Sequence, residues 1–396
     1  MTFSHPKLRE QAFSGDLYGT ALAYVRGDVD VAGDVVAAVR FFENQARRGW
    51  RQARHNLLGR MGRWRLEPWW QSRRRAAENI RHHYDRSNDF YLQFLDRGMT
   101  YSCAYFKNPE WDISRAQEAK LDLILRKLDL RPGERFLDIG CGWGSLVEEA
   151  ARRGAAATGC TLSPAQHEFA LERLRTGSAG PTVLRTDYRD LSGQWDKIAS
   201  IGMFEHVGRR RLPAYFRKVY DLLSPTGLFL NHGIVRPQTA REGVESLFLR
   251  RKVFPGSELP HLGELIRASE EAGFEVLDVE NLRPHYALTC RAWVERLLRN
   301  EEACVRFAGR ETHRTWVLYL AACAHQFETG CMDIYQTLLA RRSSPHGRRL
   351  TREYMYNGVS ARAEVSGSEG APRCADVTQG EPVIPIQEVK KRQRQG

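Results

Sequence analysis

The segment that most constrains this chain is residues 136–144, where an apolar run containing Asp138 passes directly into a glycine turn, Phe-Leu-Asp-Ile-Gly-Cys-Gly-Trp-Gly. Gly140 and Gly142 allow the backbone to turn sharply and let a ligand approach it closely. Residues 145–151 then have the pattern of a helix. A strand, a glycine turn and a helix in this order predict a pocket for a nucleotide-containing cofactor.

Two classes of cofactor compete for this pocket. A dinucleotide fingerprint requires a third glycine at position 145, where a pyrophosphate meets the helix N-terminus. This chain has Ser145 instead, which favours S-adenosylmethionine (SAM), a cofactor without phosphate. The alternative without any ligand is a glycine-rich turn that only joins a strand to a helix.

The chain after the glycine turn alternates apolar runs with helical stretches, which predicts a parallel α/β sheet with helices on both faces. A later run, residues 332–338, alternates apolar and polar residues and predicts an added edge strand. Before the turn, Ser114 and Gln117 predict a capping box at the start of a helix that Pro132 and Gly133 end. The apolar runs that predict strands are residues 155–160, 182–184, 197–201, 228–230 and 274–277.

Composition and pattern predict three parts. Residues 1–80 form a basic, helical N-terminal region, residues 81–345 form the main domain, and residues 346–396 form a basic tail. The tail is rich in Gly, Ser, Glu and Pro and has little to bury, so we expect it to be largely disordered.

The formal net charge of +12 predicts an anionic partner. Much of the excess lies between Arg40 and Arg81, where arginines mix with tryptophans. This mixture is typical of a lipid interface, and equally of a solvated basic face whose tryptophans fill the core. The sequence contains no long apolar span and no signal peptide at its start, and its eight scattered cysteines suggest neither a disulfide framework nor a metal site. We therefore expect a cytoplasmic protein.

Polar residues follow the predicted strands, at the edge of an α/β sheet where ligands bind. Glu205 and His232 follow the fourth and fifth strands, which are expected to be neighbours, so their side chains can converge. Taken separately, Glu205 is compatible with a solvated loop carboxylate and His232 with a core histidine bonded to the backbone. Their joint placement favours a functional site.

Residues 81–342 resemble the cyclopropane-fatty-acid synthase family, which includes the mycolic acid cyclopropane synthases and is a branch of the class I methyltransferases. The fold expected from this resemblance is a Rossmann-like class I methyltransferase sheet. Many enzymes with this fold have an acidic residue after the second strand that binds the ribose of the cofactor. This chain lacks such a residue, and so do members of this family. The motifs that carry the resemblance, besides the glycine turn with Trp143, are His83-Tyr84-Asp85, Asn88 to Tyr91, Met99 to Phe106, Thr161-Leu162-Ser163 with Gln166, Asp187 to Leu191, Gly202 to Gly208, Phe254-Pro255 with Leu259-Pro260, His285-Tyr286 with Thr289, and Tyr319-Leu320 with Cys323.

The resemblance implies transfer of a methylene group from SAM to the cis double bond of an unsaturated phospholipid acyl chain. Such a reaction forms a carbocation, which aromatic faces stabilise and a base must deprotonate. In this family the base is thought to be a bound bicarbonate ion. Its contacts correspond to the side chains of Glu205, His232 and Tyr286 and to the backbone amides of Cys103 and Ile234.

The resemblance also implies the cofactor contacts, and it implies no metal. Cys323 matches a cysteine sometimes described as the active-site residue of this family. Direct transfer from a sulfonium to an alkene needs no covalent enzyme intermediate, so we expect Cys323 to be a buried structural thiol. The expected cofactor-binding residues are Tyr101, Ser102, Asp138, Gly140, Gly142, Thr161, Gln166, Asp187, Tyr188 and Arg189.

Other functions remain open at this point. A related enzyme could leave a methyl branch or an exocyclic methylene on the acyl chain, or methylate the nitrogen of a small molecule. A nucleic-acid methyltransferase is disfavoured because residues 203–206 read Met-Phe-Glu-His, where an amino-methylating enzyme has an Asn/Asp-Pro-Pro-aromatic turn. A non-enzymatic basic protein with a vestigial pocket is a further alternative. We expect a protein bound peripherally to the inner face of the membrane, without nucleic acid, whose N-terminal region serves lipid docking or a homodimer.

Overall fold

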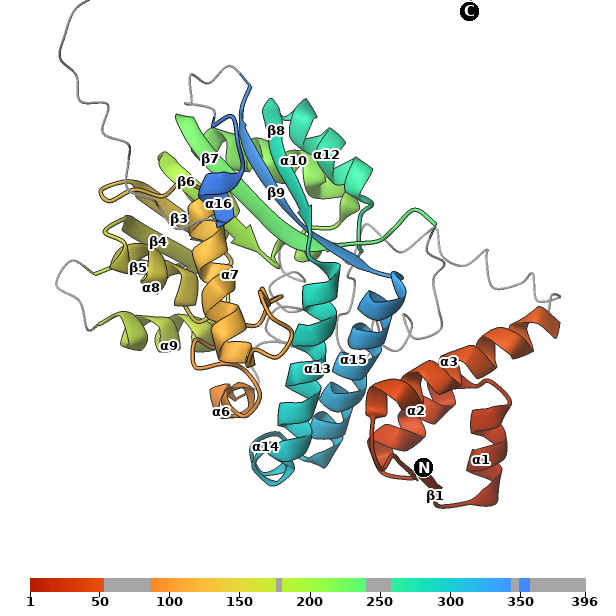
Figure 1. The fold of residues 1–396 in the computed structure, drawn as a ribbon. Helices are drawn as coiled ribbons and strands as arrows, with labels where there is room; N and C mark the ends of the chain where they lie inside the picture. The colour runs from red at the N-terminus through yellow and green to blue at the C-terminus, as the bar shows by residue number, and fades with distance from the viewer. Residues whose placement is uncertain (53–86, 176–179, 240–257, 343–348, 357–396) are drawn as a thin grey trace, which may run out of the picture. The chain divides into compact units, whose positions relative to one another are not determined.

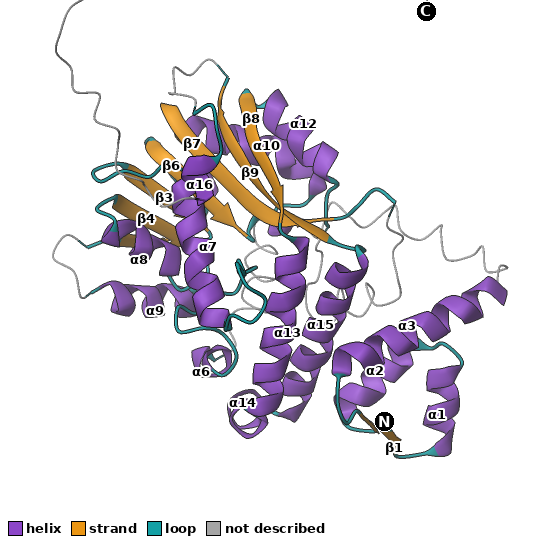
Figure 2. Cartoon of the chain, in the orientation of Figure 1, coloured by secondary structure: helices purple, strands orange, loops and turns teal. Residues whose placement is uncertain are grey.

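The computed structural model describes residues 1–52, 87–175, 180–239, 258–342 and 349–356 of the 396-residue chain, with the side chains of residues 47–52 left out. Its centre is a seven-stranded sheet in the order β5-β4-β3-β6-β7-β9-β8, seen in Figure 1 and, with strands in orange, in Figure 2. The strands are β3 (Arg135–Ile139), β4 (Ala156–Thr161), β5 (Thr182–Arg185), β6 (Trp195–Ile201), β7 (Leu223–Val235), β8 (Phe274–Asn281) and β9 (Asp333–Arg341).

Thirteen α-helices are described; α7, α8, α9, α10, α12 and α16 lie beside this sheet (Figure 1). They are α1 (Pro6–Phe13), α2 (Leu17–Arg26), α3 (Val35–Gln52), α6 (Asn88–Leu92), α7 (Ile113–Lys127), α8 (Ser145–Arg152), α9 (Pro164–Leu174), α10 (Leu212–Leu222), α12 (Leu262–Glu271), α13 (Arg283–Arg299), α14 (Glu301–Ala308), α15 (Arg310–Thr329) and α16 (Glu353–Tyr356). Two short strands, β1 (Thr2–Phe3) and β2 (Val29–Asp30), pair near the N-terminus.

The sheet is covered by helices on both faces, as the sequence predicts. Because side chains alternate along a strand, neighbouring residues enter different cores. On β7, Phe229 packs with α10 and α12, whereas Leu228 and Leu230 pack in the cluster that contains residues of α7, α8 and α9. The five strands β5, β4, β3, β6 and β7 are mutually parallel. This arrangement is the class I methyltransferase fold.

The expectation that residues 332–338 form an edge strand is wrong. Strand β9 lies between β7 and β8 and is antiparallel to both, so β8 is the edge. An alternating pattern predicts a strand but not its neighbours, and β9 carries buried residues on both faces because both sides of it are covered. This insertion places Gln336 directly opposite His232.

The predicted capping box at Ser114 is also wrong. The N-cap of helix α7 lies two residues earlier, at Asp112, whose carboxylate accepts a hydrogen bond from the Arg115 amide at 3.0 Å. An aspartate is as good an N-cap as a serine, so the earlier residue takes this position. The Gln117 side chain is thereby free to bond elsewhere, as described below.

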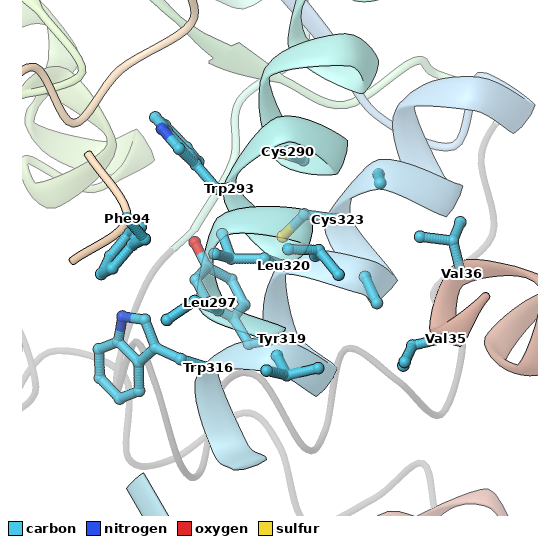
Figure 3. Packing of buried hydrophobic residues seen from close by; sticks show 14 of the residues in the cluster. Val35, Val36, Phe94, Cys290, Trp293, Leu297, Trp316, Tyr319, Leu320 and Cys323 are labelled. Carbon is cyan, nitrogen blue, oxygen red and sulfur yellow. The ribbon is translucent and has the colours of Figure 1, made fainter. Parts of the chain in front are cut away.

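A third hydrophobic cluster lies beyond the sheet, between α13 and α15 (Figure 3). Trp293 and Leu297 of α13 face Tyr319 and Cys323 of α15 there, and Phe94 lies beside them. The N-terminal helices join this cluster through Val35 and Val36 and other apolar residues. The cluster therefore combines residues far apart in the sequence.

The described part of the N-terminal region consists of the helices α1, α2 and α3 and the short β1–β2 pair. Arg314 of α15 holds it. The Arg314 guanidinium donates to the Tyr24 and Val29 carbonyls at 2.6 Å each and lies 4.2 Å from the Tyr24 ring centroid. Most of the arginine- and tryptophan-rich stretch, residues 53–81, lies outside the described residues. Of the predicted tail, residues 346–396, the structure describes residues 349–356, which contain helix α16. None of the helices described is both long and apolar enough to cross a bilayer.

Candidate active site

The glycine turn after β3 forms the base of a cavity at the carboxyl ends of the parallel strands. Gly140 has φ +81°, and a Cβ there would lie 2.9 Å from the Met203 side chain. Gly142 has φ +54°, and a Cβ there would meet no atom within 4 Å. Both conformations favour glycine, and the second leaves the backbone open for a ligand.

All ten predicted cofactor-binding residues line this single cavity, although they come from four separate segments of the chain. Sequence reasoning did not select other lining residues, among them Lys120, Met203 and His206. The ten residues are Tyr101, Ser102, Asp138, Gly140, Gly142, Thr161, Gln166, Asp187, Tyr188 and Arg189.

Local hydrogen bonds order the walls of the cavity. The Thr161 hydroxyl donates to Gln166 Oε1 at 2.9 Å, across the start of α9. Asp187 accepts hydrogen bonds from both the backbone amide and the side chain of Arg189. Each of these partners lies within five residues of the other, so the walls are built from short motifs.

Asp138 supplies a negative group inside the cavity. Its carboxyl is buried, and Oδ1 has no hydrogen-bond partner among the described residues. Burial raises the pKa of Asp138 to about 7, against the opposing charge of Lys120. SAM carries a sulfonium and an ammonium group, so an unpartnered acceptor in a glycine-lined cavity fits this cofactor.

Lys120 is a site residue that sequence reasoning missed. Its side chain extends from α7 into the cavity, is almost fully buried, and donates to Ser102 Oγ at 3.1 Å. Burial lowers the pKa of Lys120 to about 8, while Asp96 and Asp138 act in the opposite direction. A signal existed, because Gln117, Lys120 and Ile124 lie on one helix face and the third of them is a core residue.

Glu205 is buried in a short 3-10 turn after β6 and is not a solvated loop carboxylate. Its Oε1 accepts a hydrogen bond from the Ile234 backbone amide at 2.8 Å, and Oε2 has no partner among the described residues. Burial raises the pKa of Glu205 to about 7. The Ile234 amide, expected to face bicarbonate, is therefore bonded to Glu205 in this structure.

His232 lies inside β7 and not after the strand as expected, because β9 pairs with β7 through to Val235. Gln336 Nε2 lies 3.1 Å from His232 Nδ1, both residues are fully buried, and His232 Nε2 has no partner among the described residues. Burial lowers the pKa of His232 well below its ordinary value. The imidazole is neutral, and with the Gln336 amide donating to Nδ1 its proton resides on Nε2.

Tyr286, Cys103 and Cys323 belong to the apolar cluster between α13 and α15 or pack against it. The Tyr286 ring stacks on Phe327 with centroids 4.5 Å apart. Burial raises the pKa of Cys323 to about 12, so this thiol stays protonated at neutral pH. Cys323 thus has the character of a buried structural thiol.

The six predicted catalytic residues do not line the cofactor cavity. Aromatic rings connect the cofactor cavity with the cluster that contains Tyr286. The ring centroid of Trp293 lies 5.1 Å from that of Tyr101, which lines the cavity, and 6.1 Å from that of Tyr286. Glu205 and Ile234 contact each other directly, and His232 lies two residues from Ile234 in the same strand. The six are Glu205, His232, Tyr286, Cys103, Ile234 and Cys323.

Known proteins resemble this chain over most of its length. The profile of the family "Mycolic acid cyclopropane synthetase" matches residues 71–337. A probable fatty acid methyltransferase of Pseudomonas putida is 37% identical over 361 residues, which cover 89% of this chain and 90% of that protein. The cyclopropane-fatty-acyl-phospholipid synthase of Escherichia coli K12 is 37% identical over 283 residues, covering 71% of this chain and 72% of the enzyme.

A solved structure shares the fold. The mycolic acid cyclopropane synthase CmaA1, complexed with SAH and CTAB, superposes with a TM-score of 0.64 at 32% identity over 66% of this chain and 97% of that chain. The chain belongs to the mycolic acid cyclopropane synthetase family, and it is a SAM-dependent methyltransferase whose family transfers methyl or methylene groups to lipids.

Proposed function

We propose that this protein transfers a methylene group from SAM to the cis double bond of an unsaturated phospholipid acyl chain and forms a cyclopropane ring. The observation that carries the proposal is the pair of buried, unpartnered atoms Glu205 Oε2, in the turn after β6, and His232 Nε2, on the neighbouring strand β7. A lipid N-methylation creates no carbocation and needs no base placed in this way. The name of the Escherichia coli relative points to the same substrate class.

The residues of the cavity would bind and orient SAM, which supplies an electrophilic methyl group. The π electrons of the alkene form the new carbon–carbon bond as the carbon–sulfur bond breaks, and a carbocation remains on the acyl chain. The electron-rich faces of Tyr286 and Trp293 suit such a cation. A base then takes a proton from the transferred carbon, and the released electron pair closes the ring.

We propose bicarbonate as this base, held by Glu205, His232 and Tyr286. His232 would donate a hydrogen bond from Nε2 to the bicarbonate ion. The neutral carboxyl group of Glu205 would also donate a hydrogen bond to it, whereas the ionised carboxylate would repel the anion. The pKa of Glu205, about 7, makes this neutral form available. The Ile234 amide, which donates to Glu205 in this structure, would donate its hydrogen bond to the bicarbonate ion instead or share it between the two acceptors.

A second product is favoured by one observation. The Pseudomonas putida relative, which matches 89% of this chain, is described as a probable fatty acid methyltransferase. The same carbocation yields an exocyclic methylene group when a proton leaves the transferred carbon after a hydride shift along the chain. The active site alone would then decide the product.

We also propose that the enzyme works at the surface of an anionic membrane, because an acyl substrate resides there and the chain carries a net charge of +12. Basic residues near such a surface are attracted by its negative potential. We further propose that the N-terminal region takes part in this docking or in a homodimer.

The test is an assay with purified protein, SAM and liposomes of unsaturated phospholipid, in carbonate-free buffer and with added bicarbonate. Gas chromatography of the fatty acid esters should reveal a product one methylene heavier. Mild hydrogenation leaves a cyclopropane intact but saturates an exocyclic methylene, and so distinguishes the two. No lipid product would overturn the proposal, and activity independent of bicarbonate would overturn the choice of base alone.

A further inference from the structure

The Lys120 ammonium is the cavity's buried cation, and its surroundings define what it can bind. Lysine has three donors and no acceptor, so its contact with Ser102 makes Ser102 Oγ the acceptor of that hydrogen bond. The Ser102 hydroxyl proton therefore remains to be donated elsewhere. The hydroxyl donates no hydrogen bond to any acceptor among the described residues, and both Ser102 and Lys120 line the cavity.

Helix α7 fixes this pair of donors. Gln117 Nε2 donates to the Thr100 carbonyl at 3.2 Å and to the Ser102 carbonyl at 2.8 Å, so the backbone before and at Ser102 is held on the helix. Gln117 and Lys120 are three residues apart and thus lie on the same helix face. The donors need no reorganisation to receive an anionic group.

Opposite charges are arranged around the same point. Asp138 offers its unpartnered Oδ1, while Lys120 and Ser102 offer N–H and O–H donors. An acceptor beside a set of donors complements a zwitterion. SAM ends in such a group, because its methionine part carries an ammonium and a carboxylate.

We infer that Lys120 and the Ser102 hydroxyl bind the α-carboxylate of SAM and so fix the end of the cofactor that is remote from its adenine. This inference rests on the proposed placement of SAM in the cavity. A carbonate ion has the same anionic oxygens, so the experiment must separate the two sources.

The test is calorimetric titration of the full-length protein with SAM and with decarboxylated SAM, which lacks only the carboxylate. The wild-type protein should bind SAM at least about tenfold more tightly than the decarboxylated compound, because hydrogen bonds to charged groups have this magnitude. In Lys120→Met the affinity for SAM should fall about ten- to hundredfold and the preference should shrink to less than about threefold. The affinity for the decarboxylated compound should change little.

Lys127→Met is the matched control. Lys127 lies on the same helix and is equally buried, but it pairs with Asp278 and Glu280 away from the cavity. This variant should keep the wild-type preference for SAM. Ser102→Ala is a second test that leaves the buried charge in place, and it should reduce the preference in the same direction if Lys120→Met does not fold.

Each result has one meaning. If wild-type protein binds neither compound, the placement of the cofactor is wrong. If Lys120→Met or Ser102→Ala keeps the full preference for the carboxylated compound, the inference is overturned. An unchanged preference together with a higher bicarbonate requirement in the lipid assay would assign the two donors to carbonate and would also overturn it.

Discussion

The cofactor cavity and the buried acid–imidazole group, defined as Glu205, His232 and Gln336, satisfy their polar atoms in different ways. In the cavity, Thr161 bonds Gln166 within one short segment. In the acid–imidazole group, Gln336 bonds His232 across 104 residues of sequence. The cavity is built from local motifs, whereas the acid–imidazole group depends on which strands become neighbours.

This difference has a functional meaning. A cofactor site assembled from local motifs can be kept while the rest of the domain changes. The acid–imidazole group contains three buried atoms without described partners, Glu205 Oε2, His232 Nε2 and Gln336 Oε1, a costly arrangement that folded proteins retain mainly at functional sites. We therefore expect substitutions there to affect turnover far more than cofactor binding.

The largest expected effect follows from Glu205→Gln. The amide cannot exchange a proton with a bound anion, so turnover should fall by roughly 10²–10⁴-fold, the usual contribution of proton transfer. The affinity for SAH should change less than about threefold, since Glu205 does not line the cavity. Gas chromatography of the lipid product and calorimetry of SAH binding measure the two effects. Equal losses in both would erase the distinction between the two regions.

The second effect is on stability as a function of pH. The pKa of the Glu205 carboxyl is raised from 4.5 to about 7, so its contribution is fully present below pH 4.5 and is lost as the pH rises through 7. Between pH 5 and pH 8 the wild type should lose about 2–3 kcal/mol relative to Glu205→Gln. Urea unfolding of both proteins at both pH values gives this difference in the free energy of unfolding. The contribution of the buried Asp138 to the pH dependence cancels, because both proteins contain this residue. A difference independent of pH would contradict the raised pKa.

A smaller effect is expected for Gln336→Leu. Loss of the hydrogen bond to Nδ1 lets the His232 ring choose its tautomer and orientation, and kcat should fall about tenfold with an unchanged KM for SAM. Gln336→Glu should hold the ring but draw its proton to Nδ1, so it should not restore activity. Thr337→Val removes a neighbouring buried hydrogen bond to the Asn231 carbonyl and is the control. If Thr337→Val lowers kcat as much as Gln336→Leu, the effect of Gln336 is structural.

The smallest effect is expected for Cys323→Ala. The Cys323 thiol has a pKa of about 12 and packs among apolar side chains, so its removal should change kcat less than about threefold. Rates of lipid product formation measure this. Cys290→Ala, a substitution of a buried thiol in the same cluster, controls for the loss of packing. A hundredfold loss confined to Cys323→Ala would make this cysteine a catalytic group.

The sequence predicts what depends on neighbouring residues. The strands, the helices on both faces and the ten residues that line the cavity follow from local patterns and from motifs of the family. Lys120 was missed although it shares a helix face with the core residue Ile124. Gln336 was missed because a glutamine on a strand has no local signature of burial. The position of β9 was misjudged for the same reason, since alternation specifies the faces of a strand but not its partners.

The pairing of Gln336 with His232 has a consequence for biogenesis. Strand β9 is the last strand of the sheet to leave the ribosome, yet it is inserted between two strands made earlier. Until residue 341 has emerged, β9 cannot pair with β7 and β8, and the His232 imidazole has no hydrogen bond from Gln336. A nascent chain can therefore shape the glycine turn early, but it completes the site of the proposed proton transfer only after β9 has been synthesised.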